Sequence, residues 1–291
     1  MTSVDTAAWT RAQGALRYEV DRVVDLLRNV RNPTAPAVGD WNLGEVAMHL
    51  SQAWVAVPGL ARQDLTGVFD VVPNLEGTAG EGLMNDVWEL GGITMMAVNA
   101  DPERNPRVIA DRIEERAAAY FSFLASAPDA GDRTWLVNGI RVPPSVFTAH
   151  LLHETVAHAY DIATADNRPW RIERAHAALV IEGFYVPVIS ALPPRAMVNQ
   201  DAARGKHAAF AIHLRDAGTS MLAFDDGELT IEFPPSGSRR IDCHISADPA
   251  AFLLVALARQ SQWRAIARGQ LVAYGRKPWL GPQFRAFMRN P

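Results

Sequence analysis

The stretch of the chain best suited to chemistry is 150-HLLHETVAHAYD-161, which places histidines and carboxylates within a few turns of an expected helix. It differs from the zinc-protease motif H-E-x-x-H because three residues, not two, separate Glu154 from His158. His153 and His158 would lie about 140° apart around a regular α-helix, so they cannot bind the same ion. The spacing therefore excludes the protease motif.

Glu154 and His158 are four residues apart, which is the spacing that suits a shared metal ion. On a helix their side chains lie within about 40° of each other and about 6 Å apart along the axis. His150 extends this stripe by one more turn, but it lies about 12 Å along the axis from His158. Because zinc–ligand bonds are only about 2 Å long, either adjacent pair can supply two ligands, and the third is expected from another helix.

His49 is the best candidate for that third ligand, because it is the only histidine before residue 150 and lies in an apolar-rich segment. Two imidazoles and one carboxylate form a typical catalytic zinc site, which keeps a position open for water or substrate. Asp161 follows His158 by about one turn and could orient its ring. The alternative is that His49 is an ordinary packed histidine, and that Glu154 and His158 make only a contact between turns.

Helices are the elements that must position these residues. Apolar residues recur at the helical period through the first 190 residues, and Asp40 or Asn42 can cap the helix that carries His49. The Asn138-Gly139 pair has strand-forming neighbours, which indicates a short hairpin. We expect helices over 4–31, 43–57, 82–99, 105–126, from Pro144 through the 150–161 stretch, and over 171–190, with a loop over 58–80 and the hairpin over 133–144.

After about residue 205 the pattern changes to the alternation typical of strands. Charge also changes, because residues 1–199 carry 24 acidic and 16 basic side chains, whereas residues 200–291 carry 8 and 12. We therefore expect an α+β protein with a helical bundle over 1–170, followed by a linking helix and a smaller α+β unit over 171–291. The expected elements of this second part are strands over 207–216, 219–226, 228–234, 240–247 and 269–275, and helices over 249–259 and 281–289.

Composition excludes several classes of protein. The net charge of −4 does not suggest a nucleic-acid partner. No apolar run is long enough for a membrane span, and the N-terminus lacks the apolar core of a signal peptide, so we expect a cytoplasmic protein without a membrane partner. Cys243 is the only cysteine, which excludes an internal disulfide, and we expect it to be a buried strand residue.

Two segments and the strand-rich end of the chain resemble a known enzyme family. The segments are WNLGEVAMHL at 41–50 and HETVAHAYDIATADNRPW at 153–170. Together they resemble the mycothiol-dependent maleylpyruvate isomerases, which have a DinB-like four-helix bundle followed by a smaller domain similar to a sterol carrier. The resemblance implies a divalent metal, usually zinc, held by His49, Glu154 and His158, which are the residues that the spacing also favours.

The resemblance also implies an arginine near the active site, contributed by the C-terminal domain. The closest match is Arg259 within 252-FLLVALARQ-260, although the residue before it is Ala258 where the family has glycine. Arg276, which does follow a glycine, Gly275, is the alternative. Such an arginine would hold a substrate carboxylate by a bidentate contact, whereas the alternative for either residue is a solvated side chain.

The implied cosubstrate is mycothiol, the low-molecular-weight thiol of actinobacteria. A thiol with a pKa of about 8.5 is mostly protonated at neutral pH, and coordination to zinc removes that proton. The thiolate would then attack a small-molecule electrophile. Because the stretches at 58–80 and 193–206 look long for a simple isomerase, the sequence favours thiol transfer or conjugation, with cis–trans isomerisation of the maleylpyruvate type as the alternative.

Two other classes of function remain open from the residues alone. A non-catalytic ligand-binding or carrier protein would use apolar segments such as 251–257 to line a pocket. Metal-dependent hydrolysis would use the same ligands and a zinc-bound water. The second class lacks a general base, because a glutamate that serves as a ligand cannot easily serve as the base.

Overall fold

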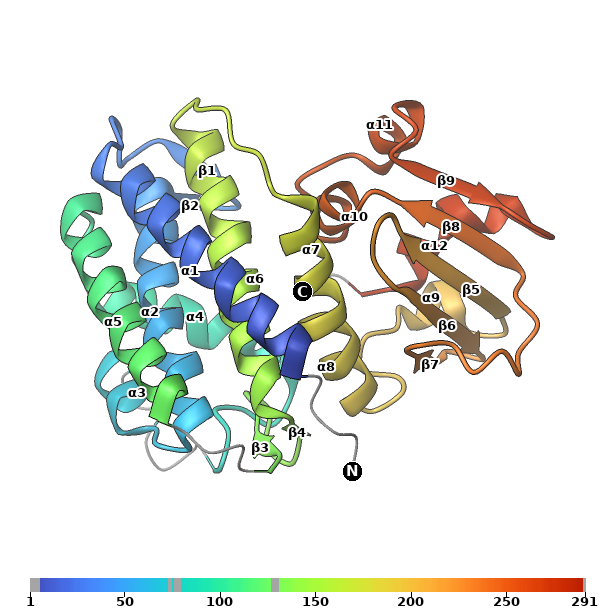
Figure 1. Cartoon of the computed structure of the whole chain (residues 1–291), viewed down its shortest axis with the longest axis horizontal. Coiled ribbons are helices and arrows are strands. Elements are labelled where there is room, and N and C mark those ends of the chain that lie inside the picture. The colour runs from blue at the N-terminus through green and yellow to red at the C-terminus, as the bar shows by residue number, and fades with distance from the viewer. Residues whose placement is uncertain (1–5, 73–74, 76–79, 127–130, 290–291) are drawn as a thin grey trace. The chain divides into compact units, whose positions relative to one another are not determined.

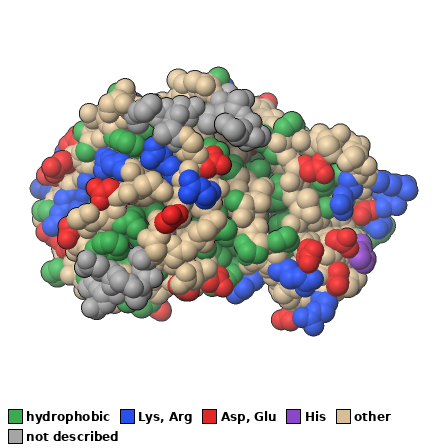
Figure 2. Space-filling model, turned by 90° about the horizontal axis from the view of Figure 1, so that it is seen from below, with side chains coloured by type: hydrophobic (Ala, Val, Ile, Leu, Met, Phe, Trp, Pro, Cys, Tyr) green, Lys and Arg blue, Asp and Glu red, His purple; other side chains and the backbone are tan. Residues whose placement is uncertain are grey.

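The structure is a computed structural model that describes residues 6–72, 75, 80–126 and 131–289, so the expected helix start at residue 4 lies outside the described part. Its contacts separate two compact units, Met1–Ile172 and Glu173–Pro291, which we call the helical unit and the sheet unit (Figure 1). Among the described residues, no helix is long and apolar enough to cross a membrane. Acidic and basic side chains are interspersed on the face drawn in Figure 2.

The helical unit is a four-helix bundle in which α1 and α2 each pack against α5 and α6 (Figure 1). Every long helix contributes fully buried side chains to the core, among them Leu16, Trp54, Tyr120 and Phe147. Each such side chain stabilises the fold by about 1.5–3 kcal/mol, so this core holds α2 against α6. The expected bundle is confirmed. The four helices are α1 (Thr6–Arg28), α2 (Leu43–Arg62), α5 (Pro106–Ser126) and α6 (Pro144–Ala165).

A capping box starts α2, the helix that carries His49. The side chain of Asn42 accepts a hydrogen bond from the backbone N–H of Glu45 at 3.0 Å. The side chain of Glu45 accepts one from the backbone N–H of Asn42 at 2.8 Å. These bonds satisfy donors that the first turn of a helix leaves unpaired. They decide between the two expected caps in favour of Asn42, and they fix the helix start two turns before His49.

The expected loop over 58–80 is wrong in its first half. Helix α2 continues through Pro58 to Arg62 and ends at Gln63, which has a left-handed φ of 55°. Proline removes one helical hydrogen bond, but Leu60 just beyond it is completely buried and favours continuation of the helix. The short helix α3 (Thr66–Val71) then follows.

The expected helix over 82–99 begins late, because the residues before it pair with the hairpin. The backbone N–H of Leu83 donates to the carbonyl of Leu136, and that of Asn138 donates to the carbonyl of Met84, both at 2.7 Å. This pairing uses backbone N–H and carbonyl groups that a helix would need for its own hydrogen bonds. The apolar pattern of the sequence does not reveal the pairing, because it joins distant segments. The elements are β3 (Arg133–Thr134) and β4 (Arg141–Val142) of the hairpin, η1 (Val87–Glu89), α4 (Leu90–Ala100), and a second ribbon of β1 (Pro36–Val38) and β2 (Trp41–Asn42).

The sheet unit contains a five-stranded sheet in the order β7-β6-β5-β8-β9. Strands β5 and β8 are parallel, and the other neighbouring pairs are antiparallel. This mixture of helices and a sheet confirms the expected α+β class. Cys243 is buried at the start of β8, as expected. The strands are β5 (His207–Leu214), β6 (Thr219–Asp225), β7 (Glu228–Glu232), β8 (Cys243–Ala247) and β9 (Leu271–Tyr274).

Helices complete the sheet unit. The expected helix over 171–190 is present as three consecutive pieces with a π-helical turn in the middle. Helix α10 (Pro249–Ala256) is capped by the side chain of Asp248, which accepts a hydrogen bond from the backbone N–H of Ala251 at 3.0 Å. The expected terminal helix starts as a 3-10 helix that contains Pro278 and Pro282, which have no N–H to donate. The helices are α7 (Arg174–Val180), η2 (Ile181–Tyr185), α8 (Val186–Ala191), α9 (Gln200–Ala203), α10 (Pro249–Ala256), α11 (Gln262–Ala267), η3 (Pro278–Gln283) and α12 (Phe284–Phe287).

Candidate metal centre

Helices α2 and α6 bring the three favoured residues together. The Nε2 atoms of His49 and of His158 each lie 3.3 Å from Oε2 of Glu154. One ligand atom from each residue lies within 4.8 Å of the others. We call these residues the His-Glu-His cluster. The rings of His49 and His158 meet edge to face, with centroids 4.6 Å apart, so the packing of the two helices sets the cluster.

The cluster lies in a mostly buried position. The side chains of His49, Glu154 and His158 retain 18%, 13% and 12% of their accessible surface. Most of the surface of each side chain is therefore removed from water. Trp41 covers His49 from one side, with ring centroids 5.4 Å apart.

The hydrogen bonding of the Glu154 carboxylate shows whether a metal ion fits the cluster. Its Oε2 atom is buried and, within the described part of the chain, accepts no hydrogen bond of normal geometry, even though two imidazole nitrogens lie 3.3 Å away. A buried carboxylate oxygen without a partner is costly. Ligands of a tetrahedral zinc ion, with bonds of about 2.0–2.1 Å, are about 3.4 Å apart. The donor types and their spacing therefore fit a divalent metal.

Asp161 orients the ring of His158. Its Oδ2 atom lies 3.2 Å from Nδ1 of His158, and its side chain is almost completely buried. A carboxylate accepts, so the imidazole proton lies on Nδ1, and Nε2 faces Glu154. A carboxylate behind a histidine in this way is the usual partner of a metal-binding imidazole.

His150 belongs to the same stripe on α6 but has a different geometry. The indole Nε1 of Trp135 lies 3.3 Å from Nδ1 of His150. An indole N–H can only donate, so Nδ1 accepts, and the proton of the neutral ring lies on Nε2. That atom lies 3.3 Å from Oε1 of Glu154. His150 thus contacts the carboxylate oxygen that faces away from His49 and His158, and its lone pair is directed at Trp135.

Trp135 was missed as a functional residue, because its sequence context indicates only a core position in the hairpin. It is buried, as expected for a core residue. Its role depends on the tertiary contact between the hairpin and α6, which no spacing in the sequence encodes. The only available signal in the sequence was a tryptophan near the Asn138-Gly139 turn and 15 residues before His150.

The pKa values of the two histidines in the cluster are shifted in opposite directions. Burial lowers the pKa of His49, and its contact with Glu154 only partly offsets this effect. Burial would raise the pKa of Glu154, but the surrounding histidines outweigh it and hold that pKa well below its usual range. Burial also acts to lower the pKa of His158, but Asp161 and Glu154 outweigh it and raise the pKa to about 9. An ion must therefore displace a proton from His158, since a metal-bound imidazole is neutral.

The two candidate arginines belong to the sheet unit. Arg259 donates to the carbonyl of Leu257 at 2.7 Å, and Ala258 before it has a left-handed φ of 59°, a conformation in which glycine is favoured. Arg276 is paired with Asp242. Because the helical unit and the sheet unit are separate bodies, a role of either arginine at the His-Glu-His cluster stays a prediction.

Residues 14–163 match the mycothiol maleylpyruvate isomerase N-terminal domain. The match covers more than half of the chain and includes the whole His-Glu-His cluster. The chain belongs to this family. Its membership in the mycothiol maleylpyruvate isomerase family confirms the resemblance drawn from the two segments and places the chain among enzymes. None of the curated proteins matches the chain.

Solved structures provide more distant likenesses. The crystal structure of the mycothiol-dependent maleylpyruvate isomerase has 9% sequence identity and a TM-score of 0.49, covering 91% of this chain and 92% of that one. A histidine-to-alanine variant of that enzyme has 10% identity, the same TM-score of 0.49 and the same coverage. A stereoselective inverting sec-alkylsulfatase from Pseudomonas sp. has 17% identity and a TM-score of 0.29, covering 62% of this chain and 28% of that one. These likenesses carry no argument about activity.

Proposed function

We propose that the chain is a mycothiol-dependent cis–trans isomerase of a small conjugated carboxylic acid of the maleylpyruvate type. The observation that carries the proposal is the buried His-Glu-His cluster within the segment that matches this family. Family membership favours isomerisation over the thiol transfer that the sequence favoured. Part of the stretch at 58–80 that suggested a different reaction belongs to α2 and α3, which weakens that argument.

In this proposal His49, Glu154 and His158 hold a divalent ion, preferably zinc. When bound, the ion lowers the pKa of a coordinated thiol, so that mycothiol is present as a thiolate at neutral pH. Asp161 holds the proton of His158 on Nδ1 and thereby keeps Nε2 available as a donor. His150 holds Oε1 of Glu154 and leaves Oε2 directed at the other two residues.

The proposed reaction is balanced without an oxidant or reductant. The thiolate sulfur adds to one carbon of the conjugated double bond, and the electron pair of that bond moves onto the neighbouring carbonyl group. The former double bond is now single and can rotate. The electron pair then returns, the carbon–sulfur bond breaks, and the thiolate leaves with the substrate in the trans form. An arginine that binds the carboxylate, Arg259 or Arg276, would hold one end of the substrate during the rotation.

The test is to incubate the metal-loaded protein with mycothiol and maleylpyruvate and to follow both products by NMR and mass spectrometry. We expect the trans isomer, a strict requirement for the thiol, and full recovery of free mycothiol. A stable sulfur conjugate that accumulates in place of the isomer would contradict isomerisation and favour thiol transfer.

Two histidine variants control the experiment. His49→Ala removes a ligand and should abolish both ion binding and isomerisation. His207→Ala alters an exposed histidine of the sheet unit, paired with Asp225, and should change neither. Full activity of His49→Ala would exclude the cluster as the site of the reaction.

A further inference from the structure

The five-stranded sheet ends in β7 on one side and in β9 on the other, and the two edges differ in how they are protected (Figure 1). At the β7 edge, the backbone N–H of Leu229 donates to the carbonyl of Pro194 at 2.9 Å, and Pro234 follows the strand. A covering segment and a proline are usual ways to keep a sheet edge from pairing with another chain. Strand β9 (Leu271–Tyr274) contains no proline and no charged residue.

The outer side of β9 offers backbone hydrogen-bonding groups to a further strand. The N–H of Asp248 donates to the carbonyl of Gln270 at 2.8 Å, so the backbone groups of Gln270 face β8. In an antiparallel pair, successive residues direct these groups to opposite sides. Leu271 and Ala273 therefore direct theirs away from β8, and within the described part of the chain nothing pairs with them there. We call this free side of the strand the β9 edge.

Exposed apolar side chains accompany the β9 edge. Val272 and Tyr274 lie on the same face of the strand and retain 44% and 46% of their accessible surface. Trp279 is 62% exposed in η3, a helix that packs against β9 through the contact of Gly281 with Ala273. Exposed apolar and aromatic side chains that gather in one place are typical of protein interaction sites.

The charge around β9 has one sign. Residues 249–289 contain seven basic side chains and no acidic one. Arg268, just before the strand, is exposed and forms no ion pair among the described residues. Just after the strand, Arg276 and Lys277 share the single carboxylate of Asp242, so one of their two positive charges is not compensated. Both ends of β9 are therefore basic.

These charges decide which occupant fits the β9 edge. If two copies of β9 paired in antiparallel fashion, Arg268 of one copy would lie near Arg276 and Lys277 of the other, and the like charges would repel. An acidic segment is instead attracted at both ends of the strand. A nucleic acid would match the charge, but it has no peptide backbone to pair with the strand.

We propose that the β9 edge binds an extended acidic segment of a partner protein, which adds a strand to the sheet. The backbone of the segment pairs with Leu271 and Ala273. Alternate apolar residues of the segment lie on Val272 and Tyr274, and its acidic residues face the basic ends of β9. The β9 edge belongs to the sheet unit, so this site depends neither on the His-Glu-His cluster nor on the isomerase reaction.

The experiment measures the binding of three short, capped, fluorescently labelled peptides to the full-length protein by anisotropy. The first alternates valine and threonine between glutamate-rich ends, the second has lysine in place of glutamate, and the third is the acidic peptide with a proline at its centre. The acidic peptide should bind at least about tenfold more tightly than the lysine peptide, because its charge is complementary. It should also bind about tenfold more tightly than the proline peptide, which lacks an N–H for the edge.

Hydrogen exchange locates the bound peptide. The amide protons of Leu271 and Ala273 point away from β8, so the acidic peptide should slow their exchange. The amide proton of Val272 faces β8 already and should change little. Metal content, measured on the same samples, should not change.

Variants test the charge and the backbone separately. Arg268→Glu should weaken binding of the acidic peptide about tenfold and strengthen that of the lysine peptide. Arg204→Glu, the same change at an exposed arginine that ends α9, is the matched control. Ala273→Pro removes an N–H that β8 does not use, so the sheet can form while peptide binding is lost. If that variant fails to fold, Val272→Glu at an exposed position should weaken binding of the acidic peptide instead.

Four results would overturn the proposal. The first is a folded protein that does not bind the acidic peptide, and the second is equal binding of all three peptides. The third is single-stranded DNA that binds more tightly than the acidic peptide and displaces it, which would indicate a nucleic-acid site. The fourth is a dimer in sedimentation that Ala273→Pro separates, which would show that a second copy occupies the edge. None of these results bears on the His-Glu-His cluster, whose failure would appear as lost metal binding.

Discussion

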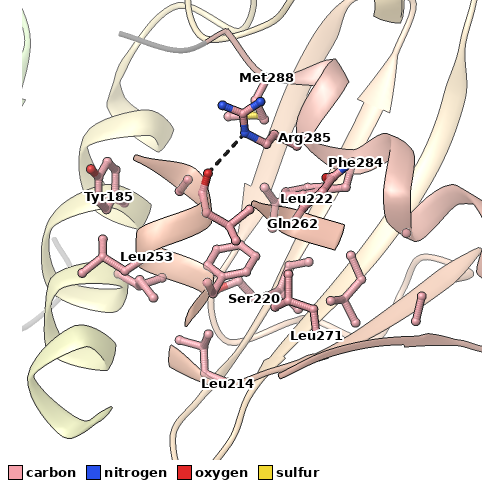
Figure 3. Close-up of a pocket in the computed structure, with 18 of the residues that line it drawn as sticks. Tyr185, Leu214, Ser220, Leu222, Leu253, Gln262, Leu271, Phe284, Arg285 and Met288 are labelled. Atoms are coloured by element: carbon pink, nitrogen blue, oxygen red, sulfur yellow. Dashed lines mark hydrogen bonds between the residues drawn. The ribbon is translucent and has the colours of Figure 1, made fainter. Parts of the chain in front are cut away.

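The His-Glu-His cluster and the sheet-unit cavity make opposite use of burial. In the cluster, two helices place the imidazoles of His49 and His158 3.3 Å from Glu154, and the buried Oε2 atom of Glu154, which has no hydrogen bond of normal geometry among the described residues, fits a ligand of an ion. In the cavity, which has a volume of about 450 Å³, strands and helices of the sheet unit surround an apolar space whose charged lining residues, among those described, are arginines (Figure 3). The polar site thus depends on a few residues at fixed distances, whereas the apolar site depends on many side chains that other apolar side chains can replace. Single substitutions should therefore damage the first far more than the second.

The largest difference is expected for Glu154→Ala. The variant leaves two imidazoles without the carboxylate that neutralises part of the charge of the ion, so metal affinity should fall by about 100-fold or more. Elemental analysis and a chelator competition measure this loss. A variant that retains one ion per chain would refute the assignment of Glu154 as a ligand.

A smaller effect is expected for Asp161→Asn, which keeps the shape of the side chain but removes its charge. The orienting partner of a metal-bound histidine typically contributes 10–100-fold in affinity, so a loss of about that size is expected in the same chelator competition. Asp111→Asn, an exposed carboxylate paired with Arg28, is a suitable control. Unchanged affinity in Asp161→Asn would show that packing alone orients His158.

The metal-free protein should lose stability as the pH rises through the pKa of His158. The folded pKa of about 9 lies above the unfolded value of 6.5. The stabilisation is therefore complete below the unfolded pKa and is lost as the pH passes the folded one, with a total of roughly 1–3 kcal/mol. Thermal unfolding between the two pKa values measures it, with His158→Gln as the reference. Equal pH dependence of both proteins would contradict a raised pKa.

The smallest effect is expected for Trp135→Phe. The variant keeps an aromatic ring in the core but removes the N–H that holds His150 in one tautomer. His150 can then present its lone pair to Glu154 for part of the time, and metal affinity should fall by about tenfold or less. The ¹⁵N chemical shifts of His150 report the tautomer directly. If those shifts do not change, Trp135 is only a packing residue.

The sequence predicts those features that depend on helical spacing. The pair on α6 follows from its four-residue separation, and the position of His49 on a helix follows from the apolar pattern around it. Together with the resemblance, this was enough to name the residues that the structure brings together, although their role as ligands stays a prediction. The four-helix bundle and the α+β class were predictable for the same reason, because their patterns are local.

The remaining features depend on contacts between distant segments. The extended backbone at Leu83 is paired with Leu136, and the tautomer of His150 is set by Trp135 from the hairpin. The cavity needs strands and helices from the whole sheet unit. No periodic pattern in the sequence reveals these contacts. The residues from 82 to 86 were therefore wrongly predicted as helix, and the hydrogen bond from Trp135 to His150 was not predicted.

The separation of His49 from α6 along the chain has a consequence for folding. Glu154 and His158 become neighbours as soon as their own helix forms, but His49 joins them only when α2 has packed against α6 across more than a hundred intervening residues. An unfolded or half-folded chain therefore offers at most a weak two-donor site. By mass action, an ion that binds only the complete set would stabilise only the finished bundle.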